Sequence, residues 1–167
     1  MASEINKSGS YLSFKLGTEV FAVHVNDVLN ILEMTKITSI PKAPKYLKGV
    51  INLRGLVLPV VDARIKFNLE TLDYTSNTCI IVMDLEYNGE LVHVGFIVDQ
   101  VLEVLELEEE NIEAAPSLGA NYKAEFITGM ARANEDFVML LNMAKIFSLD
   151  EMNMLQSENS EETTSEK

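Results

Sequence analysis

The sequence predicts an all-β protein made of two small barrels in tandem, each built from about five short strands. One observation is an internal repeat, because residues 25–32 return as residues 98–105 with four identical positions and three conservative exchanges. The other is a series of short β-forming runs separated by turn signals at close spacing. An offset of about 73 residues is far longer than a solenoid period, so it indicates two copies of one small fold.

The chain length of 167 residues fits one ordinary domain, which the repeat divides into two half-size units. A unit of that size buries only roughly 60% of its unfolded surface, so the two are expected to share an apolar core. We expect a domain over 11–155, with barrel one at roughly 11–67, onto which the C-terminal helix packs, and barrel two at roughly 78–142. The polar ends, 1–9 and 156–167, are expected to be flexible tails.

The first elements follow from hydrophobic periodicity. Alternation over 11–16 predicts a half-buried strand, and 20–25 is its return strand after a glycine turn. Asn26 or Asp27 is expected to cap a short helical turn. Residues 34–40 are interpreted as a further strand that ends at a proline.

A compact hairpin is predicted next. The runs 50–53 and 56–61 flank the dipeptide Arg54-Gly55. Pro59 has no N–H group, so the second of these strands should have an unpaired edge or a bulge there.

A short helical turn over 63–67, capped by Asp62, is expected to close the first half before a polar connector at 68–77. The Asn-Gly dipeptide at 88–89 is a strong turn signal, and Asn142 can cap a terminal helix. The second half is predicted to contain hairpins over 78–85 with 91–98 and over 126–131 with 137–141, a run at 101–107, and a helix from 143 to about 155.

Charge excludes one class of partner. The net charge is −13, whereas nucleic-acid binding needs a basic footprint. The charge is segregated, since residues 36–66 hold seven basic groups and one acid, and residues 67–122 hold twelve acids and no Lys or Arg. Such segregation can steer charged protein partners, although most of these groups can also be read as solvated surface.

No catalytic or metal-binding constellation stands out. His24 and His93 each lie in a hydrophobic run without ligands at metal spacing, so structural or surface roles are expected. Dinucleotide, P-loop and nucleophile-elbow motifs are missing. The single cysteine, Cys79, fits a reducing compartment. With neither a secretory signal nor an apolar span in the sequence, we expect a cytoplasmic protein. An enzyme is the weaker hypothesis at this point, and no cofactor or metal is expected.

The segment 49–67 contains Asn52-Leu53-Arg54-Gly55 followed by Pro-Val-Val-Asp, and it resembles the signature of the CheW family of bacterial chemotaxis coupling proteins. The resemblance covers residues 11 to about 155. It implies two SH3-like five-stranded barrels about a shared apolar core, short helical turns, a terminal helix and no catalytic activity. It also implies an adaptor between the cytoplasmic hairpin of chemoreceptors (methyl-accepting chemotaxis proteins) and the regulatory domain of the histidine kinase CheA, recruited to membrane-associated receptor arrays.

In this family the receptor hairpin docks in an apolar groove between the barrels. By position, the resemblance assigns receptor binding to Val28, Ile31, Gly49, Arg54 and Ile80, and kinase binding to Ala115, Pro116 and Leu118. The chain departs from many relatives at Asn30, where they carry a glutamate. It also has Glu113 and Leu118 where some relatives place a basic residue and an aromatic.

Two alternatives remain open at this point. One is a CheW-like adaptor of another pathway, such as surface sensing or development. The other is a ligand-binding or enzymatic double barrel, since fold alone does not fix function. A deep pocket with converging polar groups would favour this second alternative, and a shallow apolar groove would favour the adaptor.

Overall fold

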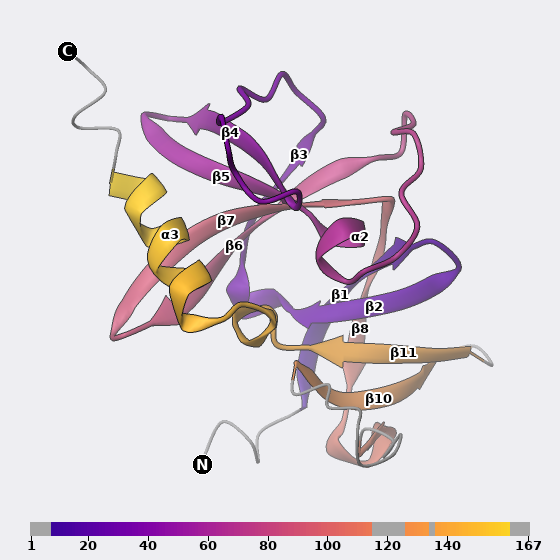
Figure 1. Ribbon diagram of the computed structural model, residues 1–167. Coiled ribbons are helices and arrows are strands. Elements are labelled where there is room, and N and C mark those ends of the chain that lie inside the picture. The colour runs from indigo at the N-terminus through magenta and orange to yellow at the C-terminus, as the bar shows by residue number, and fades with distance from the viewer. Residues whose placement is uncertain (1–7, 115–125, 134–135, 161–167) are drawn as a thin grey trace.

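Strands dominate the computed structural model, which describes residues 8–114, 126–133 and 136–160 (Figure 1). The strands are β1 (Gly9–Leu16), β2 (Glu19–His24), β3 (Val28–Glu33), β4 (Leu47–Leu53), β5 (Leu56–Asp62), β6 (Cys79–Tyr87), β7 (Glu90–Val98), β8 (Gln100–Leu107), β9 (Ile112–Glu113), β10 (Ile127–Ala133) and β11 (Asp136–Leu141). The helical elements are η1 (Val25–Asp27), α2 (Ala63–Lys66), η2 (Glu109–Asn111), η3 (Met143–Ile146) and α3 (Leu149–Ser160).

The two sheets exchange strands between the halves of the chain. The six-stranded sheet has the order β8-β1-β2-β11-β10-β9, and the five-stranded sheet has the order β3-β6-β7-β5-β4. Each sheet therefore takes strands from both halves, and the predicted division into barrels at 11–67 and 78–142 is wrong. The reason is that only η1 separates β2 from β3 and only Asp99 separates β7 from β8, so the chain runs directly from one sheet into the other.

The exchange preserves the predicted internal repeat. In each sheet, one parallel pair of strands connects the two halves of the chain. β5 of the first half lies beside β7 of the second, and β11 of the second half lies beside β2 of the first. Thr38, beyond β3, bridges to Val50 of β4, and β9, beyond β8, pairs with β10. β8 and β9 are two parts of one bent strand, and β3 continues in the same way to Thr38. Counted like this, both sheets close as five-stranded barrels, as predicted. We name each barrel after the number of strands in its sheet, so the barrel formed by β8-β1-β2-β11-β10-β9 is called six-stranded although its β8 and β9 are counted above as one bent strand.

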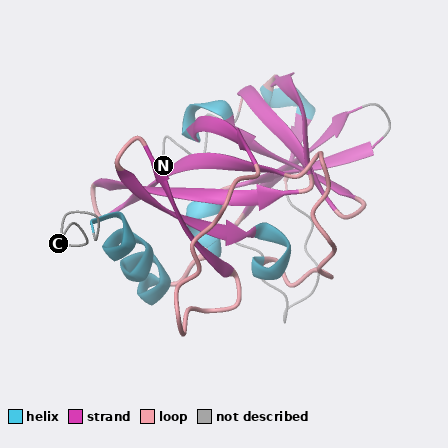
Figure 2. Ribbon diagram, turned by 90° about the horizontal axis from the view of Figure 1, so that it is seen from above, coloured by secondary structure: helices cyan, strands magenta, loops and turns pink. Residues whose placement is uncertain are grey.

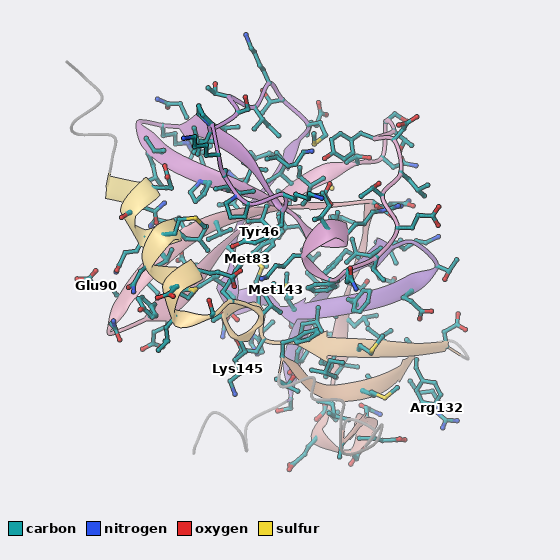
Figure 3. The ribbon with its side chains drawn as sticks, viewed as in Figure 1. Tyr46, Met83, Glu90, Arg132, Met143 and Lys145 are labelled. Carbon is teal, nitrogen blue, oxygen red and sulfur yellow. The ribbon has the colours of Figure 1, made fainter. Side chains whose placement is uncertain are left out.

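The barrels share an apolar core, which the sequence predicts. Neighbouring residues on a strand point to opposite faces, and here both faces are buried. Ile80 faces the interior of the five-stranded barrel, whereas Ile81 faces the shared core. Tyr46, Met83 and Met143 gather in this core where the two sheets meet (Figure 3). The long apolar runs therefore reflect burial on both faces of a strand.

Two local predictions in the first half are wrong. Residues 34–40 form no continuous strand, because only Thr38 pairs, with backbone hydrogen bonds of 2.9 Å to Val50 in both directions. The turn at η1 is capped by the side chain of His24, which accepts from the backbone N–H of Asn26. Asp62 does cap α2, as predicted, by accepting from the N–H of Arg64.

The C-terminal helix is broken and longer than predicted. Asn142 caps η3, and a new helix, α3, begins after Ser148. Ser148 and Glu151 form a reciprocal capping box, with N–H to side-chain distances of 2.8 and 3.2 Å. The spacing Ser-x-x-Glu is the signal for this second start. Leu155 on α3 is fully buried in the shared core, so the helix belongs to the domain.

The last turn of α3 bridges a gap between the strands β5 and β7. β5 and β7 pair only from Val60 onward, directly after Pro59, which confirms the unpaired edge expected at that proline. Asn159 lies in this gap: its amide nitrogen donates to the carbonyls of Val57 and His93, and its amide oxygen accepts from the N–H of His93. Residues 156–160, expected to be a flexible tail, are thus part of the fold.

Few and short helices accompany the strands, and α3 lies at the periphery (Figure 2). None of the helices in the described part of the chain is long and apolar enough to cross a membrane.

A polar clamp holds the start of α3 against the shared core. Lys66 Nζ lies 3.0 Å from both carboxylate oxygens of Glu151 and 4.4 Å from the ring centroid of Tyr46. The hydroxyl of Tyr46 donates to Glu151 at 2.9 Å. Burial raises the pKa of Glu151, but hydrogen bonds from the Ser148 N–H, Lys66 and Tyr46 outweigh it, and the net pKa lies below the ordinary value.

We expect Glu151→Gln to lower the free energy of unfolding by about 1–2 kcal/mol at pH 7, because charged hydrogen bonds are lost. Since the folded-state pKa is depressed, this stabilisation is present above the unfolded-state pKa near 4.5 and is lost as the pH falls through the folded-state value. Urea unfolding at several pH values measures the difference. Asp150→Asn, on the exposed neighbouring residue, is the control. A wild-type-minus-variant difference that persists undiminished at pH 2 would contradict the clamp.

Candidate functional site

The residues that the sequence assigns to receptor binding all belong to the five-stranded barrel. Val28 and Ile31 lie on β3, Gly49 on β4, Arg54 in the β4–β5 turn and Ile80 on β6. β6 comes from the second half of the chain and pairs with β3, so the strand exchange brings Ile80 opposite Leu32. β3, β4 and β5 lie together at the end of the molecule opposite to β10 and β11 (Figure 1).

β3 presents apolar side chains to solvent. Leu29 is 52% exposed and Ile31 is 45% exposed, whereas Val28 is half-buried and packs against the shared core. The register shifts between Val28 and Asn30, so Leu29 is the extra residue of a β-bulge. The amide oxygen of Asn30 accepts from the N–H of Ile31 at 2.8 Å. The sequence analysis missed Leu29, which the period-two alternation with Ile31 could have identified.

Ile80 is fully buried, and this corrects its assignment as a groove wall. Its side chain belongs to the interior cluster of the five-stranded barrel, with Leu58 and Val60 among its members. A Cβ added at Gly95 would come within 2.8 Å of Ile80, so the interior is closely packed there. Ile80 can therefore support β3 from behind but does not form part of the exposed surface.

Gly49 is also buried, and its role in the structure is to let two backbone segments meet. Its φ is 147°, and a Cβ at this position would lie 2.1 Å from the carbonyl oxygen of Thr38. Gly129 does the same in the six-stranded barrel, where a Cβ would lie 3.1 Å from the Glu113 carbonyl. The repeated glycine therefore marks the point where each barrel closes.

Arg54 is exposed at the tip of a two-residue turn. Its φ is 55° and that of Gly55 is 89°, values typical of a type I′ hairpin turn. Within the described residues its guanidinium has no hydrogen bond or ion pair. Asn52, which the sequence analysis did not single out, accepts from the N–H of Gly55 at 2.9 Å. Its signal in the sequence is an Asn three residues before a turn glycine.

The segment that contains the exposed apolar pair of β3 is rich in basic residues. Between residues 28 and 61 there are five basic residues, all exposed, and one acid, Glu33. We define the β3–β4 surface as Leu29, Ile31, Lys36, Lys48 and Arg54. Three of these five residues are basic, on a chain whose net charge is −13, and the acids Asp27 and Glu33 flank the apolar pair in the sequence.

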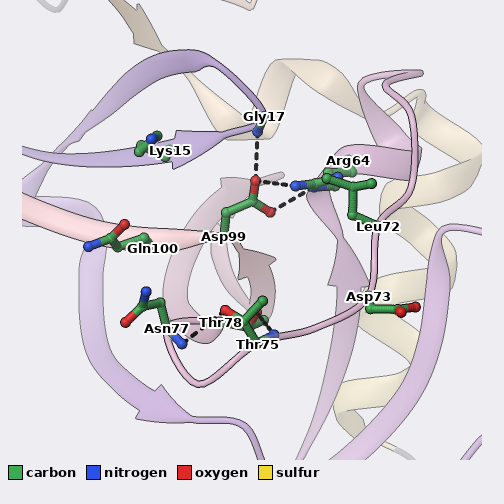
Figure 4. A pocket seen from close by; sticks show the side chains of 10 residues that line it. All are labelled: Lys15, Gly17, Arg64, Leu72, Asp73, Thr75, Asn77, Thr78, Asp99 and Gln100. Atoms are coloured by element: carbon green, nitrogen blue, oxygen red, sulfur yellow. Dashed lines mark hydrogen bonds and ion pairs between the residues drawn. The ribbon is translucent and has the colours of Figure 1, made fainter.

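A cavity of about 200 Å³ lies elsewhere, where the β1–β2 turn meets α2 and the β7–β8 junction (Figure 4). Arg64 is buried there and pairs with Asp99, which also accepts from the N–H of Gly17 at 2.6 Å. Hydrogen bonding to Asp99 raises the pKa of Arg64. Arg64 and Asp99 are paired with each other, and this network joins the two barrels, whereas Lys15 and Asp73 also line the cavity.

Both histidines have structural partners. His24 caps η1, and His93 Nδ1 forms a close contact with Asp84. The Asn-Gly turn of the β6–β7 hairpin sets the register that places Asp84 opposite His93. In the parts of the chain that the structure describes, no group of three or more His, Cys, Asp or Glu side chains could hold a metal ion.

The residues assigned to kinase binding, Ala115, Pro116 and Leu118, lie outside the described residues. Glu113, two residues before Ala115, is exposed on β9 and pairs with Met130 of β10. This end of the six-stranded barrel is acidic. The exposed acids on its β8–β9 side are Glu103, Glu106, Glu108, Glu109, Glu110 and Glu113.

Comparisons with known proteins agree on one family. The family model of the CheW-like domain matches residues 10–151. The chain is 34% identical over 147 residues to the chemotaxis protein CheW of Klebsiella aerogenes, covering 88% of this chain and 86% of that protein. It is 36% identical over 116 residues to CheW of Bacillus subtilis, covering 70% and 72%. Among solved structures, the scaffolding protein TtCheW of Thermoanaerobacter tengcongensis matches with a TM-score of 0.74 and 26% identity, covering 86% of this chain and 94% of that one.

Proposed function

This chain belongs to the CheW-like family, and from that premise we propose that it is a non-enzymatic chemotaxis adaptor that couples the cytoplasmic tips of chemoreceptors to the histidine kinase CheA. The similar proteins carry the names chemotaxis protein and scaffolding protein, which supports this role. In this proposal the protein acts in the cytoplasm and is recruited to receptor arrays at the membrane.

The observation that carries the proposal is the β3–β4 surface. Exposed apolar side chains are ordinary when scattered singly, but Leu29 and Ile31 both project from β3. An apolar pair of this kind suits the apolar stripe of an amphipathic helix. The basic members of the β3–β4 surface, Lys36, Lys48 and Arg54, would favour a helix that also carries acidic side chains.

Arg54 would orient the receptor helix on this surface. Its guanidinium is exposed and is not engaged within the described part of the chain. A guanidinium can donate a forked pair of hydrogen bonds to a carboxylate or to carbonyl groups at a helix end. Val28 and Ile80 would not face the receptor directly, but would hold β3 in place on β6.

The kinase would bind at a different place, on the six-stranded barrel. We assign this contact to Ala115, Pro116 and Leu118, which follow β9 in the sequence. Basic and acidic surfaces at separate ends of one adaptor allow two partners of opposite local charge to bind at the same time. A departure such as Glu113 would tune the choice of kinase.

A ligand-binding or enzymatic double barrel is a weaker candidate. Ligand pockets measure about 300–1,000 Å³ and are mostly apolar. The cavity beside Arg64 is smaller, at about 200 Å³, and two of its charged groups, Arg64 and Asp99, are paired with each other. No observation favours the surface-sensing or developmental pathway over chemotaxis.

Pairwise binding tests the proposal. The full chain is mixed with a receptor cytoplasmic fragment and, separately, with the regulatory domain of CheA, and binding is measured by calorimetry. We expect both to bind, and excess receptor fragment should leave kinase binding intact because the surfaces are separate. No binding to either partner, under conditions where a known coupling protein binds both, would overturn the adaptor assignment.

A further inference from the structure

The two-residue turn that carries Arg54 has an unusual composition. Residues other than glycine rarely adopt positive φ, and asparagine and aspartate do so more readily than others. The chain contains a second turn of the same kind, between β6 and β7, where Asn88 and Gly89 have φ values of 54° and 78°. That turn has the favoured Asn-Gly sequence, whereas the first turn holds an arginine in the same left-handed conformation.

Asn52 compensates for this conformation. Its side-chain oxygen accepts a hydrogen bond from the N–H of Gly55. This hydrogen bond links the end of strand β4 to the second residue of the turn. The residue at the equivalent place in the other hairpin is Glu86, and no side chain of the described residues accepts from Gly89 there. The extra hydrogen bond is therefore confined to the turn in which the first residue is strained.

The geometry points to Asn52 as a positioning residue for Arg54, and this inference rests on the proposed function. By fixing Gly55, the Asn52 side chain holds Arg54 at φ 55°, so that the Cα–Cβ bond of Arg54 keeps one direction at the hairpin tip before a partner arrives. Pre-organisation of this kind lowers the entropy lost on binding. Asn52 would not itself contact the receptor helix.

A double-mutant cycle in the full chain tests the inference. Asn52→Ala should weaken binding of a receptor cytoplasmic fragment about fivefold when Arg54 is present, and should have no effect in an Arg54→Ala background. Asn52→Asp retains a side-chain acceptor and should restore binding to within about twofold of wild type. Additive losses in the cycle would overturn the inference, because they would mean that Asn52 acts independently of Arg54.

Amide exchange of Gly55, measured by NMR without any partner, keeps this test separate from the proposed function. Asn52→Ala should speed exchange at Gly55 about fivefold, and the matched variant Glu86→Ala should leave exchange at Gly89 unchanged. Unchanged exchange at Gly55 would overturn the positioning role whatever the binding result. Faster exchange together with no wild-type binding would instead overturn the proposed function, and with it the use of Arg54 in binding.

Discussion

Arg54→Asn is expected to stabilise the fold and weaken receptor binding at the same time. Asparagine adopts the left-handed conformation at φ 55° more readily than arginine, so the free energy of unfolding should rise by about 1 kcal/mol. The same change removes the guanidinium from the hairpin tip. Since arginines at interface centres are often hot spots, binding of a receptor fragment should weaken about tenfold or more. Urea unfolding and calorimetry measure the two effects.

The other two-residue turn supplies the matched control. Asn88→Arg should lower the free energy of unfolding by about 1 kcal/mol, because it places an arginine where φ is 54°, and it should leave receptor binding unchanged. The two substitutions should change the free energy of unfolding in opposite directions, and only the one at Arg54 should change receptor binding. Together they separate the effect of turn strain from the effect on recognition. If Arg54→Asn bound the receptor fragment as tightly as the wild type, the assignment of Arg54 would be wrong.

Gly49→Ala is expected to destabilise the protein by about 3 kcal/mol or more, through backbone strain at positive φ together with overpacking. The new methyl group would lie 2.1 Å from the Thr38 carbonyl, a backbone atom that cannot rotate away as a side chain does. Relief would require the Thr38–Val50 bridge to open, which releases the segment between β3 and β4. Any fall in receptor binding should therefore follow the loss of structure. Chemical denaturation with a binding assay on the folded fraction measures both.

Gly17→Ala is the control for this substitution. Gly17 also has a positive φ, 65°, but a Cβ there would meet nothing within 4 Å. Its cost should be only about 1 kcal/mol, from the left-handed backbone alone. Equal losses for the two alanine variants would show that close approach to Thr38 is unimportant, and that the interpretation of Gly49 as a closure point is mistaken.

The repeat in the sequence predicts two similar barrels but not which strands each barrel contains. Similarity between residues 25–32 and 98–105 indicates that the two segments share a conformation. In each half, the segment leads out of the sheet of the preceding hairpin and pairs in the other sheet. A period-two pattern marks a strand and its faces without naming its neighbour. The exchange depends on the very short connections at η1 and Asp99. The sequence pattern does not specify to which sheet the chain turns after each connection.

The candidate site was predictable to a similar extent. Arg54 and Gly49 fall at special backbone positions, which their place in the hairpin motif indicates. Leu29 and Asn52 were missed, although alternation and an Asx-turn signal point to them. The burial of Ile80 could not be foreseen, because it depends on the pairing of β6 with β3 across the two halves of the chain.

Bridging by the full chain is the most direct test of the account. Receptor cytoplasmic fragments assembled on vesicles are sedimented with the isolated CheA regulatory domain, with and without this protein. We expect the kinase domain to sediment only when the protein is present, and the amount to fall about tenfold with Arg54→Asn but not with Asn88→Arg. Kinase sedimentation that does not depend on the protein, or that stays at background level when the protein is added, would contradict the adaptor function.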